Sequence, residues 1–160
     1  MDDKVLRTQL AISLSGKGAH AAFDDVVKGF RISLVGKRVP NLAHTAWQIL
    51  YHMWMTQRDI LEFVRDPAYE SPPWPSGYWP DESASGAVTE KQWEETVRKH
   101  REDLSAVIAL VKDPATDLLV PLAHGSGQTV LREALLVIDH NSYHLGQLVD
   151  IRRLLGAWKQ

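Results

Sequence analysis

Hydrophobic residues recur at helical spacing through the first 29 residues of the chain, with one interruption. The pattern begins with Val5, Leu6, Leu10 and Leu14. Gly16-Lys17-Gly18 then breaks it, because each glycine costs roughly 1 kcal/mol in a helix interior. The pattern therefore predicts a broken helical region over residues 3–29, which resumes as a short helix from Ala19 to Lys28.

Two longer periodicities predict one helix over residues 45–66 and another over residues 89–113. Each begins with a Thr-x-x-Gln capping box, in which the threonine hydroxyl accepts a hydrogen bond from a backbone N–H and the glutamine reaches back. Each ends at an Asp-Pro pair, because the residue before a proline avoids helical backbone. Both segments carry a broad apolar face, which is typical of helices packed on one side.

A fourth helix is expected over residues 129–155, with Gly156 as its C-terminal cap. Segments 30–44 and 114–128 carry glycine and proline and are expected to be loops. Four helical regions without a strand pattern predict an all-α fold, a four-helix bundle. We expect residues 1–160 to form a single domain.

Residues 67–88 form a long segment in which four prolines after Pro67 exclude a regular helix. The segment nevertheless holds the large aromatic residues Tyr69, Trp74, Tyr78 and Trp79. A disordered linker is poor in aromatic residues. We therefore expect this long aromatic loop to fold back onto the body of the protein or to lie in a subunit interface.

The composition narrows the class of protein. There are no cysteines, which excludes a disulfide scaffold, a thiolate metal site and a cysteine nucleophile, and fits a reducing cytoplasm. The formal net charge is −2, from 18 basic and 20 acidic residues without a basic stripe, which argues against a nucleic-acid partner. No apolar segment is long enough for a membrane span, and the N-terminus has no signal-peptide pattern. These features predict a cytoplasmic protein without a membrane or nucleic-acid partner.

The candidate chemistry is concentrated on the last predicted helix. His140 and His144 are four residues apart, so their side chains share one helix face. That face continues as a largely apolar stripe through Glu133, Val137, His140, His144, Leu148 and Ile151. Two inward-facing imidazoles need a partner or a metal ion, because burying an unpaired polar group is unfavourable. His52, well inside the second long helix, is the best candidate for a third ligand, and three imidazoles leave an open coordination position.

Three polar neighbours are candidates for supporting roles. Glu133 lies seven residues before His140 on nearly the same face, where it could act as an outer partner or a general base. A solvated glutamate favoured by the helix dipole is the simpler interpretation. Gln48, one turn before His52, and Gln147 could each hydrogen-bond a ligand imidazole or a substrate. Glu133 and Gln48 are the candidate catalytic residues, and no other is assigned.

The remaining histidines have simpler interpretations. His44 is expected at the entrance of the second long helix, and His20 opens the short helix. His100 stands among charged residues at 98–102 and is expected on a solvated face. His124, in a glycine-rich loop, either borders the metal pocket or serves its turn.

Three stretches of the chain resemble the DinB-like superfamily, which includes YfiT-type metal-dependent hydrolases. They are LAHTAWQILYHMWMTQRDILEF, WPSGYWP and GQTVLREALLVIDHNSYHLGQLVDIRRLLGAW, and they cover more than half of the chain. The resemblance implies a four-helix bundle with a short extra helix and a metal site of one histidine from the second helix and two from the last. Those positions correspond to His52, His140 and His144. Relatives are similar to transferases that use low-molecular-weight thiols, or to hydrolases, and many form homodimers.

Two classes of function are consistent with these observations. In the first, the protein is an enzyme that uses one divalent ion, zinc or nickel, to lower the pKa of water or of a thiol. Its substrate is a small molecule, and its reaction is a thiol-dependent transfer or a hydrolysis. In the second, a non-catalytic metal ion fastens two helices together, with Asp59 as a candidate fourth ligand. A di-iron carboxylate bundle is disfavoured, because no Glu-x-x-His pair occurs.

Overall fold

The computed structural model describes residues 3–16, 18–81 and 88–158. The elements, in chain order, are α1 (Asp3–Leu14), α2 (Phe23–Val27), α3 (Ile32–Val35), α4 (Ala46–Arg65), the 3₁₀-helix η1 (Ser76–Tyr78), α5 (Glu90–Lys112) and α6 (Val130–Leu154). Within the described ranges the only extended pairing is an isolated bridge between Pro121 and Thr129. The predicted all-α class is confirmed.

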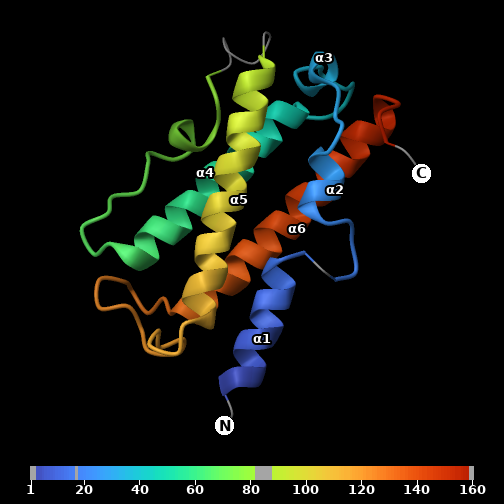
Figure 1. Ribbon diagram of the computed structural model, residues 1–160. Helices are drawn as coiled ribbons and strands as arrows, with labels where there is room; N and C mark the ends of the chain where they lie inside the picture. The colour runs from blue at the N-terminus through green and yellow to red at the C-terminus, as the bar shows by residue number, and fades with distance from the viewer. Residues whose placement is uncertain (1–2, 17, 82–87, 159–160) are drawn as a thin grey trace.

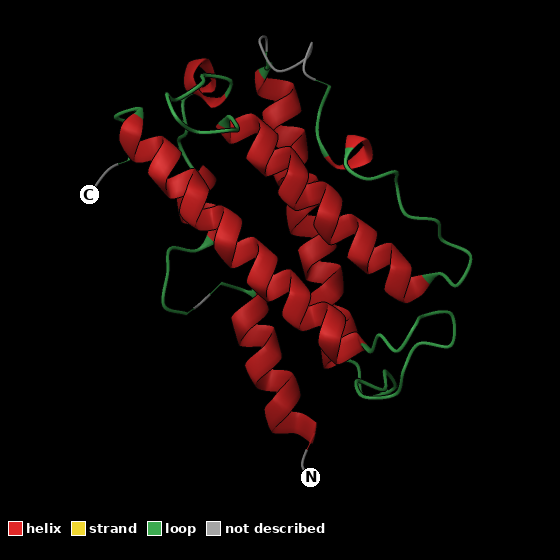
Figure 2. Ribbon diagram, turned by 180° about the vertical axis from the view of Figure 1, so that it is seen from behind, coloured by secondary structure: helices red, strands yellow, loops and turns green. Residues whose placement is uncertain are grey.

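The long helices α1, α4, α5 and α6 form the bundle, and Figure 1 shows α5 crossing in front of α4 and α6. Helix α4 packs most extensively on α5 and α6, whereas α1 packs on the end of α5 and the start of α6. Seen from behind in Figure 2, the short helices lie in the half of the bundle remote from the N-terminus. The predicted four-helix bundle with a short extra helix is confirmed.

The predicted helix ends agree with local signals. Thr45 and Thr89 each accept a hydrogen bond from the backbone N–H of the glutamine three residues on, and both glutamines reach back to complete a capping box. Thr129 accepts from the Arg132 backbone N–H at 3.1 Å. Gly156 follows the last helix with a φ of +64°, a conformation that glycine adopts without strain.

The short elements differ from the expectation. The short helix begins at Phe23 rather than Ala19, because Ala22 still has extended backbone with ψ of 155°. Gly16 has a φ of +69° and ends the first helical region, whereas Lys17 of the predicted break lies outside the described residues. Helix α3 lies in the predicted loop 30–44, because a four-residue helix is too short to produce a periodic pattern.

The core consists of two apolar clusters, one at each end of the bundle. One joins α2 and α3 to the first half of α4, the start of α5 and the end of α6. The other joins α1 to the second half of α4, the end of α5 and the start of α6. Between them the three longest helices carry the polar residues Gln57, His100 and Asn141. The middle of the bundle is therefore polar.

A buried arginine fastens the short helix α2 to α6. Arg152 is 5% exposed, and its guanidinium donates to the backbone carbonyls of Asp25, Val26 and Lys28. These carbonyls lie at the C-terminal end of α2, where the helix itself offers no backbone N–H to pair with them. The contact places α2 beside the C-terminal half of α6.

In the described part of the chain, no helix has both the length and the apolar character that crossing a membrane requires.

Candidate metal centre

Helices α4 and α6 bring three histidines together. His140 and His144 lie one turn apart on α6, with ring centroids 4.4 Å apart. His52 on α4 faces both, at centroid distances of 5.0 Å and 4.9 Å. One ring nitrogen from each residue can be chosen so that all three lie within 4.8 Å of one another. This group could hold a metal ion, and it is the only such group found among the described residues.

One pair of nitrogens in the cluster is compatible with a shared ion. The Nε2 atoms of His52 and His140 are 3.1 Å apart. Two nitrogens that bind one zinc ion at 2.0–2.1 Å in tetrahedral geometry lie about 3.3 Å apart. The same 3.1 Å also suits an N–H···N hydrogen bond between the two rings. These two nitrogens are therefore already spaced as they would be around a shared ion.

The opposite nitrogens of two rings are held by hydrogen-bond acceptors. The Nδ1 atom of His52 lies 3.3 Å from the backbone oxygen of Tyr78. The Nδ1 atom of His144 lies 2.7 Å from Oε1 of Gln147. Each Nδ1–H donates to its oxygen, which leaves Nε2 as the atom with a free lone pair. The surroundings thus select the tautomer in which His52 and His144 present Nε2 to a metal ion.

Burial keeps the cluster uncharged. Desolvation, and next the nearby His144, lower the pKa of His52 to about 4, against the opposing hydrogen bond to Tyr78. Desolvation, followed by His144 and His52, lowers the pKa of His140 to about 3. The pKa of His144 is also lowered, mainly by desolvation. All three imidazoles are neutral at neutral pH, the state in which a histidine binds a metal.

The aromatic loop covers one side of the cluster. The indole of Trp79 stacks on His52 at 4.1 Å with an interplanar angle of 3°. It also stacks on His44 at 4.0 Å and 17°. The ring of Trp74, 71% exposed, lies 6.4 Å from His52. The expectation that the loop folds back onto the body is confirmed for its described residues, and residues 82–87 lie outside them.

Asp59 anchors this loop. The Tyr78 hydroxyl donates to Oδ2 of Asp59 at 2.8 Å. Desolvation, and then the hydrogen bond to Asp59 and its charge, raise the pKa of Tyr78 to about 12. Asp59 is not part of the histidine group. The structure therefore uses this carboxylate, which the sequence suggested as a fourth ligand, to hold the loop.

The side chains of Glu133 and Gln48 are engaged with residues other than the three clustered histidines. Glu133 is 3% exposed and pairs with Arg132 at 2.6 Å, so its interpretation as a solvated glutamate is wrong. Seven residues along α6 place it about 10 Å from His140, by the helical rise. Gln48 uses its Oε1 to accept from the Thr45 backbone N–H at 2.9 Å. Both side chains thus have partners of their own outside the cluster.

The expectation that His100 lies on a solvated face is wrong. His100 is 1% exposed rather than solvated. Its place at three- and four-residue steps from Val97 and Leu104, on the buried face of α5, was a signal available in the sequence. The charged neighbours at 98–102 concealed that signal.

The other histidines stay at the edges. His44 precedes the N-cap residue of α4, as expected, and stacks on Trp79. A ring nitrogen of His124 lies 2.7 Å from the Phe63 backbone oxygen at the far end of α4. His20 is exposed, and its Nε2 lies 3.0 Å from the Ser142 hydroxyl oxygen. None of these three belongs to the group of His52, His140 and His144.

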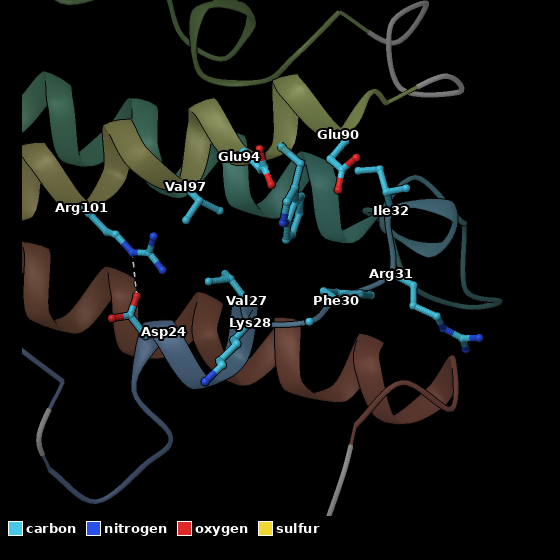
Figure 3. A pocket seen from close by; sticks show the side chains of 12 residues that line it. Asp24, Val27, Lys28, Phe30, Arg31, Ile32, Glu90, Glu94, Val97 and Arg101 are labelled. Atoms are coloured by element: carbon cyan, nitrogen blue, oxygen red, sulfur yellow. Dashed lines mark hydrogen bonds and ion pairs between the residues drawn. The ribbon is translucent and has the colours of Figure 1, made fainter.

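Two hollows on the surface are possible approaches to the histidine cluster. A hollow of about 600 Å³ is bordered by Trp79, His44, Gln48 and Arg38, among others. A groove of about 800 Å³ between α2 and α5 is shown in Figure 3, with Arg101 paired to Asp24. Neither hollow is lined by any of the three clustered histidines, but the first is bordered by Trp79, which stacks on His52. The hollow beside Trp79 is the better placed for a molecule that approaches the cluster.

The comparison with known proteins identifies the family of the fold. The model of the DinB superfamily matches residues 17–148, well over half of the chain. All three clustered histidines fall inside the matched range. Searches of curated proteins and of solved structures found no match.

Proposed function

Since the chain belongs to the DinB superfamily, we propose that it is an enzyme that depends on one divalent metal ion held by His52, His140 and His144. The observation that carries the proposal is the convergence of three neutral imidazoles from two helices within 4.8 Å. Zinc and nickel are the ions that we propose, because both accept imidazole ligands. The reaction that we propose is a transfer involving a low-molecular-weight thiol, or a hydrolysis, on a small-molecule substrate.

The ligand set supports chemistry at the ion. Three protein ligands and an open position are typical of catalytic zinc sites, whereas structural sites fill all four positions. When bound, the ion would supply Lewis acidity, which lowers the pKa of water or of a thiol. The ligands are uncharged, so they leave the full charge of the ion available for this effect.

The chain's own residues orient and shield the site. The Tyr78 backbone oxygen and the Gln147 side chain hold the rings of His52 and His144. Trp79 covers His52 and excludes water from that side. The hollow of about 600 Å³ beside Trp79 gives a small substrate room to approach. We place the substrate there, with the exposed ring of Trp74 on its border.

A second candidate is a non-catalytic ion that fastens α4 to α6. It is favoured by the close cover of the cluster, in which His52 is 5% and His144 7% exposed. The two candidates differ in what metal removal does. A structural ion would be required for folding, whereas loss of a catalytic ion would leave the bundle folded.

The experiment that tests the proposal is elemental analysis of the purified, untagged protein beside a His140→Ala/His144→Ala variant. We expect one divalent ion per chain in the wild type and none in the variant. His20→Ala/His124→Ala is the matched control, because neither residue belongs to the cluster, and it should keep the ion. A wild-type protein without metal after incubation with zinc or nickel would falsify the proposal.

Activity and assembly are tested with the loaded protein. Thiol-transfer and hydrolysis assays with zinc or nickel bound should show turnover that the His140→Ala/His144→Ala variant lacks. We further propose a homodimer, which light scattering on the same preparation measures directly. A monomer at all concentrations would reject the dimer without affecting the metal site.

A further inference from the structure

The middle of the bundle contains a polar layer formed by Gln57 on α4, His100 on α5 and Asn141 on α6. It separates the two apolar clusters of the core. Gln57 and His100 are each only 1% exposed. Burying a polar side chain without a hydrogen bond is destabilising, so the partners of these residues must be identified.

Hydrogen bonds of Gln57 join all three helices. Its Nε2 donates to the backbone oxygen of His100 at 2.8 Å. Its Oε1 accepts from Nδ2 of Asn141 at 2.9 Å. One carboxamide on α4 thus fixes a point on α5 and a point on α6 together.

Three polar atoms of the layer have no hydrogen-bond partner. They are both ring nitrogens of His100 and Oδ1 of Asn141. The imidazole of His100 stacks on the ring of Phe23 at 4.0 Å. This contact packs one face of the ring but gives its nitrogens no hydrogen bond. Burial lowers the pKa of His100, and the nearby Asn141 side chain acts in the opposite direction. The geometry between the two side chains nevertheless falls short of a hydrogen bond.

A small cavity lies beside His100 and Asn141. It has a volume of about 30 Å³ and is lined by both His100 and Asn141. A cavity needs roughly 10–15 Å³ of space to hold one water molecule, and a buried water needs two to four polar partners. Oδ1 of Asn141 and the ring nitrogens of His100, which lack partners, are the groups with which such a water would pair.

We propose that Gln57, His100 and Asn141, completed by one internal water molecule, set the register of α4 against α6 and so position the histidine cluster. The part of this inference that concerns metal affinity rests on the proposed function. Gln57 stands five residues after His52, and Asn141 directly follows His140. A slip of α4 by one helical turn, 5.4 Å, would break the amide pair and separate His52 from His140.

Directional bonds are what makes the layer selective. The apolar clusters above and below it are held by contacts that have no preferred direction and tolerate several registers. A buried amide pair is satisfied in only one register, which is how single polar residues select alignment in helical assemblies. Asn141 and His140 are neighbours that point to different sides of α6, so two successive residues carry the alignment and a cluster histidine.

The test uses the double variant Gln57→Leu/Asn141→Leu. It removes both side-chain amides together, so neither is left buried without its partner. The control is Thr96→Val, because Thr96 is a buried polar residue of α5 whose hydroxyl donates to Gln92 within its own helix. Cobalt(II) is the probe, since its visible absorption reports coordination geometry. Circular dichroism establishes that each variant is folded.

We expect cobalt affinity to fall 10- to 100-fold in the double variant, with an altered absorption spectrum, and to be unchanged in Thr96→Val. A crystal structure of the metal-free double variant should show the Nε2 atoms of His52 and His140 farther apart than 3.1 Å. The wild-type crystal at high resolution should show a water between His100 and Asn141.

Wild-type affinity, spectrum and nitrogen separation in the double variant would overturn the positioning role. An empty cavity in the wild-type crystal would overturn the water site. If the wild-type protein binds no cobalt, the proposed function fails instead, and the nitrogen separation in metal-free crystals still decides the inference. A double variant that does not fold is replaced by Asn141→Leu alone, with the same readouts.

Discussion

Burial of single imidazoles decides the charge state of the cluster. The pKa of His52 is lowered to about 4 and that of His140 to about 3, in both cases mainly by desolvation. Protons therefore compete with a metal ion for these rings only in acid. The proposed site should hold its ion well below the pH at which an exposed histidine, with a pKa near 6.5, becomes protonated.

Gln147 is the residue whose change should weaken metal binding without removing a ligand. Its Oε1 accepts from the Nδ1–H of His144 at 2.7 Å. Loss of such an outer partner typically costs 10- to 100-fold in metal affinity. We expect this loss in Gln147→Leu, measured by competition with a chelator. The exposed Gln9→Leu on α1 is the control, and equal affinities in the two variants would contradict the prediction.

His100 should make stability depend on pH. Its pKa is lowered to about 4, first by desolvation and further by Arg101, while Asn141 and Asp24 oppose the shift. The unfolded chain binds a proton near pH 6.5 and the folded chain only near pH 4, so stability is lost as pH falls through this window. One such group contributes a slope of up to about 1.4 kcal/mol per pH unit.

Urea unfolding of the metal-free protein at pH 7 and pH 5 measures this effect. The free energy of unfolding should be lower at pH 5, and the difference should be smaller in His100→Leu. His52 and His140 contribute with the same sign, so some of the difference should persist. An unchanged difference in His100→Leu would show that His100 does not titrate as described.

At the scale of elements, the two capping boxes have the same chemistry in different surroundings. The Thr45 box is buried, with Thr45 only 1% exposed, whereas the hydrogen bonds of the Thr89 box are exposed. Water can replace the lost bonds at Thr89 but not at Thr45. The start of α4 therefore depends more on its cap.

Replacing each cap by alanine should separate the two cases. A lost N-cap costs about 0.5–2 kcal/mol. We expect Thr45→Ala to lie at the upper end and Thr89→Ala at the lower end, because an unsatisfied buried donor adds its desolvation cost. Chemical denaturation of both variants measures the difference. Equal losses would mean that the buried box gains nothing from its surroundings.

For the whole molecule, the two apolar clusters indicate that the bundle can fold without an ion. Both contain residues from α4, α5 and α6, so the helices that hold the histidines are also held by apolar packing. A chain of this length buries a large share of its surface on folding. Metal binding should add to this stability rather than create it.

Metal removal tests this view. We expect the chelated protein to keep its helical circular dichroism and to unfold cooperatively at a lower Tm. An ion present at 100 times its Kd adds about 2.7 kcal/mol, which is several degrees in Tm for a domain of this size. The His140→Ala/His144→Ala variant should show no shift with chelator. Loss of helicity on chelation would favour the structural-ion alternative.

The sequence by itself determined the features that depend on neighbours within a few residues. These features are the capping boxes, the Asp-Pro ends and the left-handed backbone conformation at Gly156. They predicted the bounds of three long helices almost to the residue. The spacing of His140 and His144 is local too, because four residues make one helical turn. The pairing with His52 came from a resemblance, since spacing cannot show which faces of two helices meet.

Only the tertiary structure decided what lies across the bundle. It brings His52 within 3.1 Å of His140, which is 88 residues away, and lays Trp79 on His52. It also buries His100 and joins Gln57 to Asn141, despite charged neighbours that suggested a solvated face. Such contacts depend on how whole helices pack. A stretch of sequence states which side of a helix is apolar, but packing chooses the partner that each polar residue on that side finds.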